Sequence, residues 1–117
     1  MSSGAPPSGE GPSWMFLSNH AHVLVCLARD PDTRLRDVAL QVGITERGVS
    51  KIVAELEAGG VIERVKEGRR NHYEIDGGVA LRHPLESSRT VGMLLEMLLE
   101  RGEAKRLGLD TRRRSAS

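Results

Sequence analysis

Two short amphipathic segments meet at Gly43 within LRDVALQVGITERGVSKIVAEL, residues 35–56. Apolar residues recur at helical spacing before and after this glycine: Leu35, Val38, Ala39 and Val42 on one side, and Ile44, Val49, Ile52, Val53 and Leu56 on the other. Gly43 can adopt the left-handed conformation of a sharp turn, and Thr45 can cap a second helix that runs to about residue 58. The pattern predicts two helices that cross near Ala39 across a short turn, a helix-turn-helix.

The flanking sequence predicts three further elements. A helix is expected from Ser18 until RDPD at 29–32, because Pro31 disfavours the helical conformation of the residue before it. The stretches VIERVK (61–66) and NHYEI (71–75), joined by EGRR, predict a hairpin with a basic tip, in which Val61, Val65, Tyr73 and Ile75 alternate with charged or polar residues. A last helix is expected over about 87–101. Both this helix and the helix expected from Ser18 are apolar on more than one side. This favours their burial against a second subunit.

Length and composition fit one mainly helical domain. The chain has 117 residues, of which 38% are hydrophobic and only 3% aromatic, so an aliphatic core is expected. We expect disordered tails at 1–13 and 102–117, the second of them basic, around a domain at 14–101. The first basic residue is Arg29, and no apolar run approaches the ~20 residues of a membrane span, so a cytoplasmic protein with no membrane partner is expected.

The formal charge of +1 does not indicate any class of partner. Only the distribution of charge along the chain can do so. The helix-turn-helix followed directly by a basic hairpin resembles the winged helix-turn-helix transcriptional regulators of the bacterial MarR and ArsR type. The resemblance covers residues 14–101 and is strongest over 34–75. It implies a mainly α fold with a small β-hairpin wing, dimerised through the terminal helices. It also implies a homodimer that sets two recognition helices into successive major grooves of a palindromic operator in double-stranded DNA.

The resemblance assigns candidate DNA-binding residues to three segments. They are Arg34 and Arg36 at the start of the second helix, Thr45, Glu46, Arg47, Gly48, Ser50 and Lys51 at the start of the recognition helix, and Arg69, Arg70, Asn71 and His72 at the wing. Arg47 suits a guanine, Gly48 would let the DNA approach closely, and the wing suits phosphates or a narrow minor groove. The expected dimer interface consists of Val23, Leu27, Val91, Leu94, Leu95 and Leu98.

Other functions find less support in the sequence. His22 and Cys26 share a helix face, but two ligands do not make a metal site, and a buried thiol is usually inert, so neither a metal nor a cofactor is expected. No phosphate loop or nucleophile–base pair indicates an enzyme. Two alternatives stay open: a winged-helix module for protein interaction, and an architectural DNA-binding protein without an operator. The sequence identifies no small-molecule effector.

Overall fold

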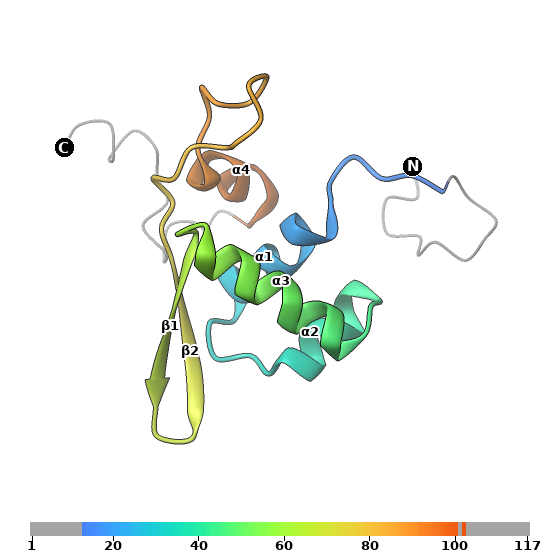
Figure 1. Ribbon diagram of the computed structural model, residues 1–117, viewed down its shortest axis with the longest axis vertical. Coiled ribbons are helices and arrows are strands. Elements are labelled where there is room, and N and C mark those ends of the chain that lie inside the picture. The colour runs from blue at the N-terminus through green and yellow to red at the C-terminus, as the bar shows by residue number, and fades with distance from the viewer. Residues whose placement is uncertain (1–12, 101, 103–117) are drawn as a thin grey trace.

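A computed structural model describes residues 13–100 and residue 102. Its elements follow in the order α1 (Asn19–Arg29), α2 (Leu35–Val42), α3 (Glu46–Ala58), β1 (Ile62–Glu67), β2 (Arg70–Ile75) and α4 (Val91–Leu98) (Figure 1). Four helices and one antiparallel hairpin in this order form a winged helix-turn-helix, which confirms the predicted fold class. The tails expected at 1–13 and 102–117 lie outside the described residues, apart from Ser13 and Gly102.

The turn between α2 and α3 forms as the sequence predicts. Gly43 has φ +88°, in the left-handed region, and its N–H donates to the Ala39 carbonyl at 2.8 Å. The Ile44 N–H donates to the same carbonyl at 3.2 Å, so the end of α2 is satisfied before the chain leaves it. Thr45 then caps α3, and its hydroxyl oxygen accepts from the Gly48 N–H at 3.0 Å. These contacts fix the direction in which α3 leaves α2.

Helix α1 lies at the centre of the molecule, in contact with α2, α3, β2 and α4 (Figure 1). Val23, Leu27 and Ala28 on this helix have no exposed surface, and they belong to one continuous hydrophobic core. The sequence associated the apolar character of α1 with a second subunit. Within one chain, α2 and α3 cover one part of α1 while β2 and α4 cover others, so the burial of these three residues needs no partner chain.

Strand β1 has its inner face one residue away from the expected position, whereas Tyr73 and Ile75 of β2 lie on the expected face. Directly opposed residues of an antiparallel pair share a face, and the register pairs Arg64 with Tyr73 and Val65 with His72. Ile62 and Tyr73 are buried at the inner face, whereas Val65 stands on the other face. Arg64 occupies the next inner position of β1, with its guanidinium carbon 5.9 Å from the centre of the Tyr73 ring. The long arginine stem thus fills a place where the sequence suggested a valine.

Helix α4 is shorter than the helix expected over 87–101. It begins at Val91 because Thr90 caps it, with the hydroxyl oxygen accepting from the Met93 N–H at 3.2 Å. Thr90 also forms an isolated antiparallel bridge with Ala80, so the residues before α4 are held in an extended conformation. The helix ends at Leu98, and Arg101 lies outside the described residues. The expected start at residue 87 was therefore wrong.

Candidate nucleic-acid interface

Helix α3 presents polar side chains on its outer face near its start. Glu46, Arg47, Ser50 and Lys51 are exposed, while Val49, Ile52 and Val53 are buried against the core. The two sets alternate at helical spacing, so one face is anchored and the other is free to meet a partner. The four exposed side chains and the capping Thr45 were all expected at a DNA contact.

Gly48 has a local structural reason that the sequence did not reveal. A Cβ atom at this position would lie 3.2 Å from the Thr45 Oγ1 atom and 3.6 Å from the Ile44 Cδ1 atom. A side chain here would crowd the hydroxyl group that caps the helix. The close approach of DNA at Gly48 stays a prediction, beside this intramolecular reason for a glycine.

The acidic residues in the second half of α3 have partners on other elements. A Glu55 carboxylate oxygen lies 2.6 Å from His20 Nε2 on α1, and a Glu57 carboxylate oxygen accepts from the Arg64 guanidinium at 2.8 Å. Both pairs lie away from the start of the helix, where Arg47 and Lys51 stand. The first half of α3 is therefore the more basic half, although the helix as a whole is slightly acidic.

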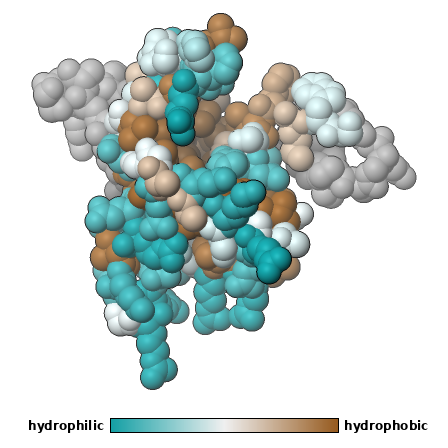
Figure 2. Space-filling view, in the orientation of Figure 1, coloured by the Kyte–Doolittle hydropathy of each residue, from teal (hydrophilic) through white to brown (hydrophobic). Residues whose placement is uncertain are grey.

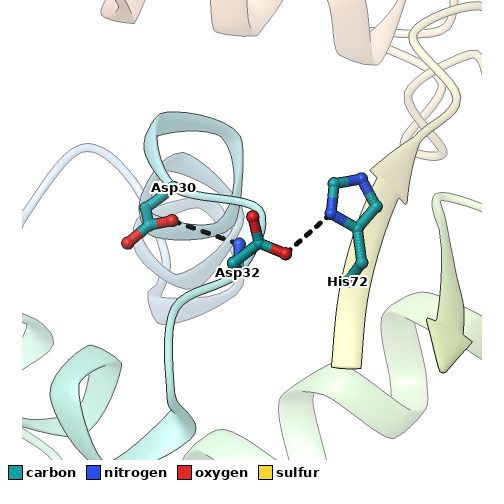
Figure 3. Close-up of polar contacts among 3 residues, drawn as sticks. All are labelled: Asp30, Asp32 and His72. Carbon is teal, nitrogen blue, oxygen red and sulfur yellow. Dashed lines mark hydrogen bonds and ion pairs between the residues drawn. The ribbon is translucent and has the colours of Figure 1, made fainter. Parts of the chain in front are cut away.

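Strand β2 is hydrogen-bonded to the loop between α1 and α2. The Tyr73 N–H donates to the Pro31 carbonyl at 2.9 Å, so β2 pairs at one point with this loop. His72 Nδ1 donates to Asp32 Oδ1 at 2.9 Å, and the Asp32 N–H in turn donates to Asp30 Oδ1 at 3.1 Å (Figure 3). In the structure one ring nitrogen of His72 contacts the body of the protein, and the expected contact of this residue with DNA stays a prediction.

The surroundings of His72 favour its charged form. The hydrogen bond to Asp32 raises the pKa of the imidazole, desolvation lowers it, and the negative charges of Asp32, Glu67 and Glu74 raise it further, so that the pKa lies above its usual value of 6.5. The wing therefore has a cluster of carboxylates on one face, directly beside the basic residues of its tip.

Three arginines from two separate segments converge beside the wing. Arg34 caps the start of α2, while Arg69 and Arg70 belong to the hairpin tip, and all three line one pocket between the helix and the hairpin. Asn71 and one acidic residue, Asp32, line the same pocket. Backbone N–H groups at a helix start and guanidinium groups both favour anions, so this pocket has the chemistry for a phosphate group. Arg36, the second residue of α2, is also exposed.

Cys26 and His22 use different partners and do not combine. The Cys26 thiol donates to Gln41 Oε1 at 3.4 Å, whereas His22 Nδ1 lies 3.2 Å from Asn19 Oδ1 on its own helix. Burial raises the pKa of the thiol above its ordinary value of 9.0, and the positive charge of Arg29 lowers it by less. The thiol has the surroundings of a structural cysteine.

The expected dimer residues have two kinds of surroundings within a single chain. Val23, Leu27, Val91 and Leu95 are buried in the core, whereas Leu94 is half-buried and Leu98 is 37% exposed. Other large apolar side chains near the chain ends are exposed, and the sequence analysis did not single them out: Trp14, Met15, Phe16 and Met97. Figure 2 shows hydrophobic residues gathered around α4, while hydrophilic residues predominate over the hairpin.

One comparison with known proteins gives a match. Residues 19–63, from the start of α1 to the start of β1, match the family model described as winged helix-turn-helix DNA-binding. No curated protein matches the chain. The matched region contains the whole helix-turn-helix and supports a DNA-binding regulator. None of the described helices is long and apolar enough to span a membrane.

Proposed function

We propose that the chain is a sequence-specific regulator of transcription of the MarR or ArsR type, which binds a palindromic operator in double-stranded DNA as a homodimer. The observation that carries the proposal is the convergence of Arg34, Arg69 and Arg70 on one pocket between the start of α2 and the hairpin tip. Three cations that flank a helix-turn-helix would supply the phosphate contacts that orient a recognition helix on DNA.

Base recognition is assigned to the first half of α3. Arg47 has the geometry for two hydrogen bonds to guanine, and Lys51 and Ser50 lie on the same outer face. The pairs that engage Glu55 and Glu57 keep those carboxylates occupied at the far half of the helix. A major groove would therefore meet the basic half of α3 first.

The homodimer is assigned to the end of the molecule that carries α4. Figure 1 shows α4 at the end opposite to the hairpin tip, so a contact there leaves α3 and the wing free for DNA. Met97 and Leu98 are exposed on α4, as are Trp14 and Phe16 before α1. A two-fold contact of this kind would set the recognition helices about 34 Å apart, one turn of DNA.

The test is to replace both wing arginines, Arg69→Ala and Arg70→Ala, in one variant. Fluorescence anisotropy would measure affinity for a random duplex and for the DNA upstream of the protein's own gene, at about 50 and 200 mM salt. Loss of two phosphate contacts should weaken binding to both DNAs and lower the slope of log affinity against log salt by about 1.8. The unaltered chain should also prefer one short palindrome.

The matched control removes two arginines elsewhere, Arg82→Ala and Arg89→Ala, both exposed in the segment between the hairpin and α4. This variant should bind DNA almost normally. Steep salt dependence without sequence preference would favour an architectural DNA-binding protein. Failure of the unaltered chain to bind DNA at low salt would overturn the proposal and favour the protein-interaction module.

A further inference from the structure

Three potential metal ligands from different segments meet on the outer face of the wing. Asp32 lies in the loop between α1 and α2, Glu67 ends β1, and His72 belongs to β2. One ligand atom of each residue lies within 4.8 Å of the other two. The strand register explains the meeting of the second and third, because Glu67 stands on the same hairpin face as His72, two positions along β1 from its partner Val65. Asp32 completes the group, because its Oδ1 atom accepts a hydrogen bond from His72 Nδ1 (Figure 3).

We propose that Asp32, Glu67 and His72 bind a divalent transition-metal ion such as Zn²⁺, which fastens the wing to the loop before α2. One imidazole nitrogen and two carboxylates are ligands that Zn²⁺ accepts, with a water molecule in the fourth position. A nitrogen ligand disfavours the hard ions Mg²⁺ and Ca²⁺, which prefer oxygen alone. The site is distinct from the pair of His22 and Cys26, which share a helix face but do not by themselves make a metal site.

The geometry needs only small side-chain movements. Ligand atoms at about 2.0–2.2 Å from a tetrahedral zinc ion lie about 3.3 Å from one another. The Asp32 Oδ1 and His72 Nδ1 atoms, now 2.9 Å apart, would separate slightly, and the Glu67 carboxylate would move closer. Asp32 and Glu67 are exposed, so their side chains are free to rotate. The metal would take the place of the proton on His72 Nδ1, which leaves to the solvent.

Metal binding would act on the DNA-binding surface through position and charge. Arg69 and Arg70 lie between two of the ligands in the chain, so a metal that holds Glu67 and His72 also fixes the tip of the wing. It would offset the charge of two carboxylates that repel phosphates. The gain in affinity for DNA should resemble one added phosphate contact, roughly tenfold near 0.1 M salt.

The first experiment measures metal binding without DNA. Zn²⁺ is titrated by calorimetry into the full, metal-free chain at about pH 7.5. At this pH the metal readily displaces the proton of a histidine ligand into the solvent. We expect one ion per chain. Glu67→Gln and His72→Ala should each lower the affinity by at least about tenfold, since even loss of an outer-shell partner costs roughly 10- to 100-fold. Glu67 is exposed at the end of a strand, so the first of these variants keeps the test valid if the second unfolds.

The matched control is the double variant His22→Ala and Cys26→Ser, which should bind Zn²⁺ as the unaltered chain does. Loss of binding in this control, or binding that survives both Glu67→Gln and His72→Ala, would overturn the proposed site. Absence of binding to the unaltered chain would overturn it as well.

The second experiment measures DNA affinity with Zn²⁺ and with a chelator. This effect rests on the proposed function, whereas metal binding does not, so the two can fail separately. We expect Zn²⁺ to raise the affinity for DNA about tenfold in the unaltered chain and not in Glu67→Gln. Equal affinity in both conditions would overturn the coupling, and failure of the metal-free chain to bind any DNA would instead count against the proposed function.

Discussion

The side chains of the buried helix α1 differ in how much their surroundings restrict their chemistry. Cys26 is enclosed between core residues and Gln41, and burial keeps its pKa above the ordinary value. The thiolate is the form that reacts with alkylating and oxidising agents, so a raised pKa and restricted access act in the same direction. The neighbouring position on this helix face, His22, is more open and contacts only its own helix turn.

We expect Cys26 to react slowly while the chain is folded. At about pH 7.5, alkylation by iodoacetamide should be at least about tenfold slower than in the same chain unfolded by urea, because the folded thiol is both less ionised and less accessible. The folded rate should keep rising with pH to values above 9.0, in line with the raised pKa. Mass spectrometry of timed samples measures both rates. Equal rates in the folded and unfolded chain would contradict the structural role of Cys26.

Residues that act together in space could be predicted only where the chain itself brings them together. Thr45 and Gly48 are three apart, and the capping contact follows from that spacing. Asp32 and His72 are forty positions apart, and no local pattern joins them. The backbone hydrogen bond from the Tyr73 N–H to the Pro31 carbonyl brings their two segments together, and it is a tertiary contact.

The elements differ in how directly they follow from the sequence. Helices α2 and α3 lie where the apolar spacing and Gly43 predict them, because both boundary signals are local. The apolar spacing alone did not predict the start of α4, which depends on the local cap at Thr90 and on a non-local bridge between Ala80 and Thr90. The inner face of β1 was missed for a related reason, since it is set by the pairing of Arg64 with Tyr73 on the opposite strand.

The position of α4 depends on its contact with the segment that follows the hairpin. The Gly92 N–H donates to the Gly77 carbonyl at 2.8 Å, and a Cβ atom at Gly92 would lie 2.9 Å from that carbonyl oxygen. Backbone meets backbone here, so a side chain cannot be accommodated by a rotamer change. The close approach holds the first turn of α4 against the chain that leaves β2.

Gly92→Ala should therefore destabilise the fold. Alanine in a helix is ordinarily more favourable than glycine by about 1 kcal/mol, but the clash at Gly77 forces a backbone shift that costs about 1–3 kcal/mol. We expect a net loss in the free energy of unfolding, measured by urea denaturation followed by circular dichroism. Leu85→Ala is the control, and it should stay within about 0.5 kcal/mol because Leu85 is 89% exposed and lies outside α4. A Gly92→Ala chain as stable as the unaltered one would show that α4 is not held at this contact.

The molecule as a whole separates its basic and its apolar surface. The hairpin tip and the start of α2 carry Arg69, Arg70 and Arg34 at one end, and Figure 2 shows hydrophobic residues around α4 at the other. Arg82 and Arg89 are also exposed, in the segment that precedes α4. Met97 and Leu98 on α4 lie with their side chains partly or largely in solvent. Exposed apolar side chains of this size, gathered near one helix, are typical of an interface. The arrangement permits a second copy to bind at α4 while both recognition helices stay accessible.

Met97→Glu and Leu98→Glu together should therefore weaken operator binding without touching DNA. Two buried carboxylates would oppose association of the copies, and sedimentation velocity should show the species change from dimer to monomer. A monomer holds one half-site, so its operator affinity should fall by about 10²-fold or more, and its affinity for random DNA should fall much less. Leu85→Glu, which adds the same charge at a position 89% exposed and outside α4, is the matched control and should change neither property. If the double variant stays dimeric, the interface lies elsewhere; if it is monomeric and binds the operator normally, one copy suffices, and the requirement for a homodimer is wrong.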